Sequence, residues 1–353
     1  MTGHELVLKA MGAERTFSSV VLRGGLGLVE PLYRGAVAVR NAAFTLGLRR
    51  QKKLGRPTIS VGNIIAGGSG KTPMVLELAG RLLAAGYQPA ILLRGYKSGL
   101  IGSDEAKLLA KALRGEVQVE ANRDRVRGAK RVLARQSGVD LFLLDDAFQH
   151  RQVCRDLDLV LLKADDPFGG DHLLPRGFLR EPKCCLLRAN AVIVTHSDRV
   201  TPMELENLDR QIKRLSGRRP IAHTVHRWAG LRGGGGGNHG EVGVLAGQRV
   251  LGVCGIGSPG AFLATLRNQT ARDLESMTFG DHHEYGMSDL QEVFRMAVGN
   301  QCTAVVTTEK DWVKWEKLLV GKDSPPIPVY RPVLEIGFLD GSAEVDGLIQ
   351  SVR

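Results

Sequence analysis

The stretch that decides the fold is PTISVGNIIAGGSGKTP, residues 57 to 73, in which a β-branched run opens into a glycine-rich loop. Thr58 to Val61 predict a buried strand, and residues 74 to 86 (MVLELAGRLLAAG) carry helical apolar spacing and end at a glycine. Glycines let backbone N–H groups converge on phosphate oxygens, a lysine reaches the β- and γ-phosphates, and a threonine hydroxyl ligates Mg²⁺. The stretch therefore predicts a nucleotide-binding strand–loop–helix. The residues expected to hold the phosphates are Gly67, Gly68, Ser69, Gly70, Lys71 and Thr72.

The loop departs from the G-x-x-x-x-G-K-[ST] pattern at its first position. That pattern places a glycine at position 65, where this chain has Ile65, with Gly62 three residues earlier. An ordinary glycine-rich turn is the alternative interpretation. The apolar strand before the loop and the helix after it favour phosphate binding.

Composition limits the broad class of protein. The 353 residues, 43% of them hydrophobic, predict two globular units. The sequence has no uncharged apolar stretch of 18 residues, and the first 16 residues lack the apolar core of a signal peptide, so we expect a cytoplasmic protein. Five cysteines without a C-x-x-C pair favour reduced thiols over disulfides or zinc.

A net charge of +11 predicts an anionic partner. Aromatic content is only 5% and no RNP-like run is present, so we expect no nucleic-acid partner. Residues 32 to 50 predict a helix with one apolar and one polar face, followed by a basic cluster at residues 49 to 56. This segment either meets an anionic membrane surface or packs on the domain as an ordinary surface helix.

The order of elements predicts an α/β fold. Between residues 57 and 200, apolar runs alternate with helical patterns, as in P-loop NTPase-like α/β/α sandwiches with a mostly parallel sheet. A second, smaller α/β pattern follows the glycine run at 233 to 237, and the extended segments 219 to 227 and 327 to 336 flank it as a two-stranded connector. The expected domains are a P-loop domain (1–218), a connector (219–248), a small α/β domain (249–326), and a returning strand and tail (327–353).

Several acidic and histidine residues are candidates for chemistry. Asp145 and Asp146 end the apolar run FLLDD, where P-loop proteins place a Mg²⁺-holding carboxylate, and His150 follows close enough to contact a phosphate. A solvated acidic turn is the alternative. Asp104 begins a helix, where capping is the default role. In GDHHEY, adjacent histidines are a poor metal pair, whereas a histidine paired with an aspartate of the other domain could act as a general base.

Two other functions compete with phosphoryl transfer to a small acceptor. One is a GTPase-like metallochaperone or switch, and the other is a basic nucleic-acid-binding ATPase. Residues 196 to 198 (HSD) lack the Asn-Lys pair that reads guanine, which favours ATP over GTP.

Taken together, the motifs resemble one family, tetraacyldisaccharide 4'-kinase, the lipid A kinase of Gram-negative-type bacteria. The resemblance runs from about residue 30 to 340. Its segments are SVGNIIAGGSGKTP, LLRGYKS, GSDEAKLLA, ANRDRVRGA, LLDDAFQHRQVCRDLDLVLL, PFGGDHLLPRGFLREP, CGIGSPGAFLATL, TFGDHHEY and TTEKDWVKW. The family's own loop also lacks the leading glycine.

The resemblance implies transfer of the ATP γ-phosphate to the 4'-hydroxyl of a tetraacylated glucosamine disaccharide 1-phosphate, forming lipid IVA. It implies that Lys71 binds phosphates, that Thr72 and Asp145 hold Mg²⁺, and that Asp104 paired with His282 accepts the hydroxyl proton. The other residues implied to line the site are Glu105, Asp146, His150, Glu181 and Asp281. The resemblance also implies a peripheral or shallowly inserted location at the cytoplasmic face of the inner membrane, and we expect a monomer.

Three positions depart from the family pattern without removing a proposed catalytic group. Ser69 replaces the usual Thr, Ala106 replaces the usual Pro, and Ala147 replaces the usual Gly after the two aspartates. Because glycine is usually kept where φ is positive or backbones approach closely, Ala147 puts the local substrate geometry in question.

Overall fold

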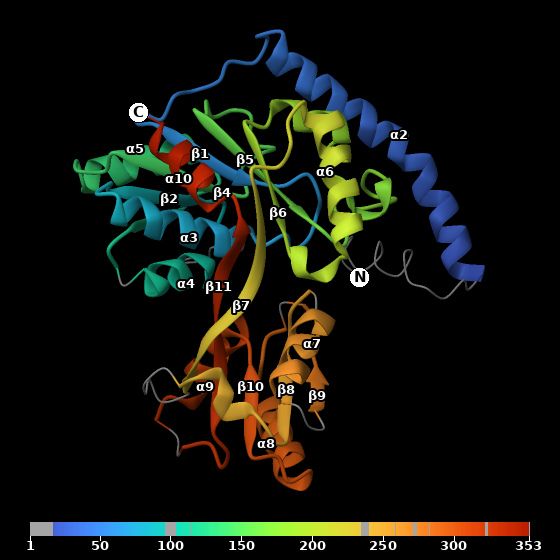
Figure 1. The fold of residues 1–353 in the computed structure, drawn as a ribbon, viewed down its shortest axis with the longest axis vertical. Coiled ribbons are helices and arrows are strands. Elements are labelled where there is room, and N and C mark those ends of the chain that lie inside the picture. Colours follow the sequence, from blue (N-terminus) through green and yellow to red (C-terminus); the bar gives the residue numbers. More distant parts are fainter. Residues whose placement is uncertain are drawn as a thin grey trace. The chain divides into compact units, whose positions relative to one another are not determined.

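The computed structural model describes residues 17–95, 104–113, 115–233, 240–257, 259–270, 274–281, 283–321 and 324–352. The chain divides into two compact units, Met1–Val225 with Ile336–Arg353, and His226–Glu335. The strands β7 (Ala222–Gly233) and β11 (Val329–Asp340) each contribute residues to both units. The order of elements along the chain can be followed by colour in Figure 1.

Unit 1 is an α/β fold with a parallel sheet, as the sequence predicts. The strands run in the order β3-β2-β4-β1-β5-β6 and then the start of β7, and each pairing between them is parallel. The elements are α2 (Phe17–Thr45), β1 (Thr58–Gly62), α3 (Lys71–Ala84), β2 (Pro89–Leu93), α4 (Asp104–Ala112), β3 (Gln118–Ala121), α5 (Arg125–Arg135), β4 (Leu141–Asp145), β5 (Leu157–Lys163), η1 (Gly169–Asp171), η2 (Lys183–Arg188), β6 (Ala191–Thr195), η3 (Ser197–Arg199), α6 (Pro202–Ser216) and α10 (Ser342–Gln350).

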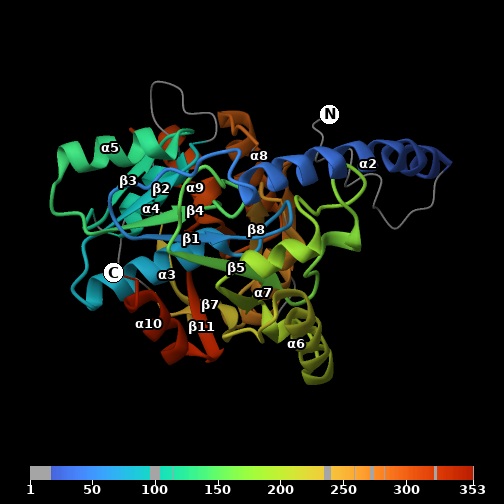
Figure 2. The ribbon, with the colours of Figure 1, turned by 90° about the horizontal axis from the view of Figure 1, so that it is seen from above.

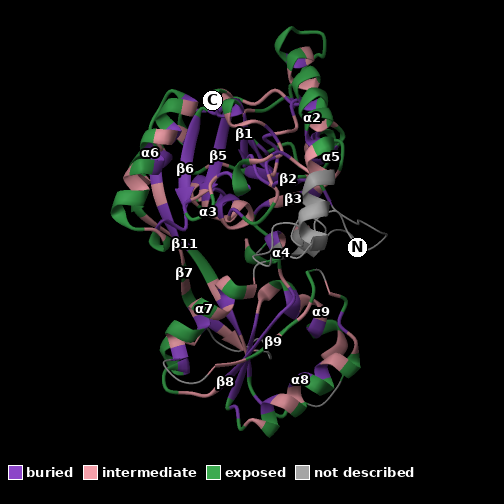
Figure 3. Ribbon diagram, turned by 90° about the vertical axis from the view of Figure 1, so that its right-hand side faces the viewer, coloured by how far each residue is buried: buried purple, intermediate pink, exposed green. Residues whose placement is uncertain are grey.

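The side chains of each strand alternate between the two faces of the sheet, and this divides the core of unit 1 into two layers. Leu141 and Leu143 of β4 pack with α3 and α10, whereas Phe142 and Leu144 pack with α5. Successive side chains of a strand point to opposite faces, so helices on both faces bury the central strands of the sheet. Figure 2 shows α3 and α10 on one side of the sheet and α5 on the other, and the strands are drawn as buried in Figure 3.

Unit 2 repeats the strand–helix alternation on a smaller scale. Its strands run in the order β11-β10-β8-β9, and β10 pairs in parallel with both β11 and β8. The two tryptophans of α9, Trp312 and Trp315, are buried in its core. The elements are η4 (Val242–Leu245), β8 (Val250–Cys254), α7 (Pro259–Thr270), β9 (Leu274–Thr278), α8 (Met287–Gly299), β10 (Ala304–Thr307) and α9 (Glu309–Leu319).

Helix α2 differs from its prediction in both bounds and packing. It begins at Phe17 instead of residue 32, continues through Pro31, and ends at Thr45, two residues before Gly47 adopts a φ of 73°. Its packed side includes the polar residue Asn41, whereas Leu32 and Val39 of the predicted apolar face are 74% and 71% exposed. The predicted apolar face therefore points away from the domain, and the side of α2 that packs carries the buried apolar residues Val37 and Phe44 together with Asn41.

Candidate active site

The glycine-rich loop lies at the carboxyl end of β1, beside the acidic turn that ends β4. The two strands are adjacent and parallel, with Val61 in register with Asp145, so both segments emerge at one edge of the sheet. Gly70 caps α3 in the left-handed region with a φ of 78°, and Gly67 has a φ of 139°. The first backbone N–H groups of α3 therefore point into the loop, where a helix N-terminus favours an anion.

Ser69 fixes the shape of the loop through its side chain. It is fully buried, and its hydroxyl accepts a hydrogen bond from the Asn63 side-chain amide at 2.8 Å. The Thr195 hydroxyl donates to the Ser69 carbonyl oxygen at 3.2 Å. The Ser69 hydroxyl therefore anchors the loop to the end of β1, and the Ser69 carbonyl oxygen anchors it to the end of β6.

Thr72 and Asp145 meet as the sequence predicts for a magnesium site. The Thr72 hydroxyl donates to Asp145 Oδ2 at 3.2 Å, and the Asp145 side chain is almost fully buried. Behind it, the buried guanidinium of Arg125 donates to the Asp145 carbonyl oxygen at 3.1 Å. Burial lowers the Arg125 pKa to about 10, so this group stays charged at neutral pH. A hydroxyl and a carboxylate are the hard oxygen ligands that Mg²⁺ uses beside substrate phosphates.

Lys71 lies against Asp146 and its own loop. Its Nζ is 3.6 Å from Asp146 Oδ1 and donates to the Gly67 carbonyl at 3.3 Å. Burial lowers the Lys71 pKa, and the charge of Asp146 offsets this only in part. Arg180 Nη1 contacts both Asp146 oxygens at 2.9 Å. Burial opposes the ionisation of Asp146, but the two cations outweigh it and hold the Asp146 pKa below its usual range.

The acidic turn has a strained backbone at Asp146. Its φ is 50°, a conformation that non-glycine residues adopt at a cost of order 1 kcal/mol. Ala147 has no positive φ and is buried in the apolar layer beneath α5, so alanine fits where the family pattern has glycine. The close approach lies instead at Gly62, where a Cβ atom would lie 2.6 Å from Phe148 Cβ.

His150 is half-buried near this turn and neutral at physiological pH. Burial, with the charges of Arg125 and Arg155, lowers its pKa to about 4. A neutral imidazole suits hydrogen bonding to a phosphate or an aspartate, the roles predicted from sequence.

The remaining predicted site residues do not join this cluster by described contacts. Glu181 is fully buried, and its carboxylate accepts hydrogen bonds from Arg40 at 2.5 Å, Asn41 at 3.1 Å and Arg188 at 2.7 Å, which docks α2 on unit 1. Asp281 is exposed in unit 2. The side chains of Asp104 and Glu105 at the start of α4, and the whole of His282, lie outside the described residues.

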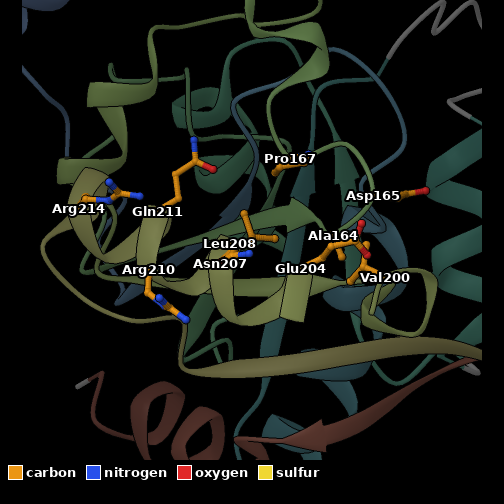
Figure 4. A pocket seen from close by; sticks show the side chains of 10 residues that line it. All are labelled: Ala164, Asp165, Pro167, Val200, Glu204, Asn207, Leu208, Arg210, Gln211 and Arg214. Carbon is orange, nitrogen blue, oxygen red and sulfur yellow. The ribbon is translucent and has the colours of Figure 1, made fainter. Parts of the chain in front are cut away.

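A surface pocket of about 600 Å³ lies between α6 and the segment that follows β5, as Figure 4 shows. None of its lining residues belongs to the phosphate loop or the acidic turn. Two carboxylates (Asp165, Glu204) and two guanidinium groups (Arg210, Arg214) line it, so its charges balance and offer no net attraction to a nucleotide.

Comparison with known proteins decides the family. The family model described as tetraacyldisaccharide-1-P 4'-kinase matches residues 25–333. The chain belongs to this family. A tetraacyldisaccharide 4'-kinase of Anaeromyxobacter dehalogenans (strain 2CP-C) is 37% identical over 326 residues, which cover 88% of this chain and 85% of the relative. One of Syntrophus aciditrophicus (strain SB) is 38% identical over 307 residues, covering 80% and 81%.

A solved structure of the family shares the fold. The LpxK protein of Aquifex aeolicus, crystallised in complex with ATP, superposes with a TM-score of 0.73 at 29% identity, covering 94% of this chain and 99% of that chain. That protein binds ATP, which is the class of ligand that the glycine-rich loop of this tetraacyldisaccharide 4'-kinase family member is built to hold.

Sequence reasoning missed three polar residues that shape this family member's loop and acidic turn. They are Asn63, Arg125 and Arg180. Their side chains donate hydrogen bonds to Ser69, Asp145 and Asp146, which lie 6, 20 and 34 positions away in the chain. A signal for Arg180 is its place directly before Glu181 in FLREP, and a signal for Asn63 is its place directly after the buried strand.

Proposed function

We propose that this protein transfers the γ-phosphate of ATP to the 4'-hydroxyl of a tetraacylated glucosamine disaccharide 1-phosphate, forming lipid IVA. The observation that carries the proposal is the phosphate loop, with Lys71 and the Thr72–Asp145 pair at one sheet edge, in a chain of this family. The γ-phosphate carries most of the charge that changes during transfer, so positioned cations lower the barrier.

The loop residues have separate roles in this proposal. Backbone N–H groups at the start of α3 bind the β- and γ-phosphates, and Lys71 leaves Asp146 for a phosphate oxygen while Arg180 continues to neutralise Asp146. Thr72 and Asp145 would hold Mg²⁺, which when bound neutralises phosphate charge. His150 donates or accepts a hydrogen bond in its neutral form.

The acceptor hydroxyl needs a base. In this proposal Asp104 paired with His282 takes the proton of the 4'-hydroxyl as the phosphate arrives. Asp281 and Glu105 flank these two residues in sequence and contribute to the same site. Steady-state rates of Asp104→Asn and His282→Ala proteins test the pair, because wild-type rates in both would exclude it.

We further propose that the protein acts at an anionic membrane surface through α2. On this helix Leu28, Leu32 and Val39, with Leu46 after its end, form a stripe at four- and seven-residue spacing that is 71–80% exposed. The basic cluster at residues 49 to 56 follows, where lysines and arginines attract anionic headgroups. Among the described residues, none of the helices combines the length and the hydrophobicity that a membrane-spanning segment requires.

Vesicle flotation separates surface attachment from ordinary packing. We expect the wild-type protein to float with vesicles containing anionic lipid, and the Leu32→Ser/Val39→Ser protein to remain in solution with an unchanged melting temperature, because neither side chain packs on the domain. Equal flotation of both proteins would contradict attachment through this stripe.

Transfer of label tests the reaction itself. The assay supplies [γ-³²P]ATP and the tetraacylated disaccharide 1-phosphate in detergent micelles, with Mg²⁺ present or chelated. We expect Mg²⁺-dependent labelling of the lipid and loss of labelling in Lys71→Met. An ATP-binding preparation that labels no lipid would contradict the proposed acceptor.

A further inference from the structure

Residues 172 to 181, here called the docking segment, pair with the residues that lead into the phosphate loop. The Arg180 N–H donates to the Ile64 carbonyl oxygen at 2.8 Å, and the Ala66 N–H donates to the Phe178 carbonyl oxygen at 2.7 Å. Between these two hydrogen bonds the segments form an antiparallel bridge. The backbone of the docking segment therefore fixes the entry to the phosphate loop.

The side chain of Arg180 connects the docking segment to the acidic turn as well. Its Nη1 lies 2.9 Å from both carboxylate oxygens of Asp146, and Asp146 Oδ1 lies 3.6 Å from Lys71 Nζ. Arg180 thus contacts the entry to the loop through its backbone and the carboxylate beside Lys71 through its side chain. A shift of this one residue would change both contacts.

Helix α2 contacts the docking segment at Arg180 itself. The Tyr33 hydroxyl donates to the Arg180 carbonyl oxygen at 3.0 Å. The Tyr33 ring packs against the apolar cluster that contains Ile64 and Leu179. Burial raises the pKa of Tyr33, so its hydroxyl stays a donor at neutral pH. Tyr33 therefore holds Arg180 by a directed hydrogen bond and by packing.

The residue after Arg180 is held by a buried cluster of charges. Glu181 is fully buried, and its Oε1 accepts hydrogen bonds from Arg40 at 2.5 Å and Asn41 at 3.1 Å. Arg188 donates to the other carboxylate oxygen at 2.7 Å. Removing one partner of a buried ion pair is strongly unfavourable, so this cluster fixes Glu181 on α2, and with it the adjoining Arg180.

The other end of the docking segment bonds to the same side of α2. Glu30 is buried, and its Oε1 accepts a hydrogen bond from the Leu173 N–H at 3.3 Å. At 3.6 residues per turn, positions 30, 33 and 40 share one face of α2, and the exposed apolar stripe falls on the opposite face. One face of the helix therefore docks on unit 1, and the other carries the stripe.

We propose that Tyr33, Arg40 and Glu181 are positioning residues, which hold Arg180 and the phosphate loop in the geometry that binds ATP. None of the three touches ATP in this inference; each acts through the docking segment. The inference rests on the proposed function only in taking ATP as the ligand of the loop. Helix α2 then supports the nucleotide site with one face, independently of membrane contact by the other.

The test is isothermal titration of the full chain with ATP and Mg²⁺. Tyr33→Phe removes only the hydroxyl, and we expect the dissociation constant of ATP to rise about 2- to 10-fold, the range of one neutral hydrogen bond. Tyr87→Phe is the matched control, because the Tyr87 hydroxyl also donates to a backbone carbonyl, that of Gln350, at 3.2 Å. It should bind ATP as the wild type does.

Arg40→Met tests the buried cluster. It leaves Glu181 with one of its two guanidinium partners, and we expect a larger rise, about 5- to 30-fold, because charge-assisted hydrogen bonds are stronger. Arg40→Lys keeps the cation and should recover most of the affinity. Arg135→Met is the control, since it likewise takes one of two guanidinium partners from a buried carboxylate, Glu120, and should leave ATP binding unchanged.

Two further measurements separate positioning from stability and from membrane attachment. Titrations well below the melting temperature of each variant report binding by folded protein, so a loss of stability alone leaves the dissociation constant unchanged. Tyr33→Phe should float with anionic vesicles as the wild type does, whereas Leu32→Ser/Val39→Ser should keep the wild-type affinity for ATP. Equal weakening of ATP binding by Leu32→Ser/Val39→Ser would contradict separate roles for the two faces.

The outcomes distinguish this inference from the proposed function. Wild-type affinity for ATP in Tyr33→Phe or Arg40→Met would overturn the positioning role of the residue concerned, and an equal rise in the two control proteins would overturn the role of the docking segment. Weakened ATP binding in Tyr33→Phe and Arg40→Met alone would support the inference even if the wild-type protein labelled no lipid, a result that would overturn only the proposed acceptor.

Discussion

Replacing Arg180 by methionine should weaken ATP binding without removing a loop residue. In the wild-type protein Asp146 shares its charge between Arg180, at 2.9 Å, and Lys71, at 3.6 Å. Without Arg180, Lys71 becomes the cation facing this carboxylate and must leave it to reach a phosphate. A charge-assisted hydrogen bond contributes about 1.5–3 kcal/mol, and solvent screening of side chains 28% and 36% exposed reduces this to about 1–2 kcal/mol.

That free energy corresponds to an increase of roughly 5- to 30-fold in the dissociation constant of ATP, because about 1.4 kcal/mol is a factor of ten. Isothermal titration with ATP and Mg²⁺ measures it directly. Arg199→Met is the matched control, since Arg199 is also 28% exposed and pairs with Asp165, away from the loop.

A second substitution identifies the cause. Adding Asp146→Asn to Arg180→Met removes the carboxylate that retains Lys71, and ATP affinity should return toward the wild-type value. ATP binding by Arg180→Met that is within twofold of the wild-type and Arg199→Met proteins would refute the shared-charge reasoning. A double variant as weak as Arg180→Met would show that Arg180 binds phosphate itself.

Three further perturbations test other parts of the site and fold. Thr72→Val should lower kcat at least 10-fold and raise the Mg²⁺ concentration needed for half-maximal labelling, because Asp145 loses its companion ligand; unchanged Mg²⁺ dependence would contradict that pairing. Gly62→Ala should lower the free energy of unfolding by about 1–3 kcal/mol, since the new methyl group meets Phe148, and a denaturant titration with wild-type midpoint would disprove the clash. His223 bonds two carboxylates through its ring nitrogens, at 3.0 and 2.8 Å, which raise its pKa despite burial; its stabilisation is therefore complete below about pH 6.5 and is lost as the pH rises through the raised value. Melting temperatures of wild type and His223→Gln should differ most at pH 6 and converge by pH 9, and a constant difference would exclude this titration.

The parts of the fold that depend on local pattern follow from the sequence. Strands β1 and β4 follow from the apolar runs at residues 58 to 61 and in FLLDD, because such runs are buried on both faces of a parallel sheet. Strand β3 is only four residues long and mostly half-buried, so its composition carries little signal.

The parts that depend on distant partners could not be predicted. The glycine loop and the carboxylate after β4 have fixed local signatures, but the Arg180–Asp146 pair joins residues 34 apart. The packed face of α2 includes Asn41, whose partner Glu181 lies 140 residues away in the chain. The neutral state of His150 arises from burial and two neighbouring guanidinium groups, which no sequence pattern encodes.

The position of the new phosphate on the lipid identifies the acceptor hydroxyl. Phosphorus–proton correlation NMR of the lipid product, made with wild-type protein, ATP and Mg²⁺, reports which sugar carbon carries the added group. We predict a second phosphorus signal coupled to the proton at C4' of the distal glucosamine, absent from a Lys71→Met reaction. A phosphate coupled to any other position, or ATP consumed with the lipid unchanged, would contradict transfer to the 4'-hydroxyl.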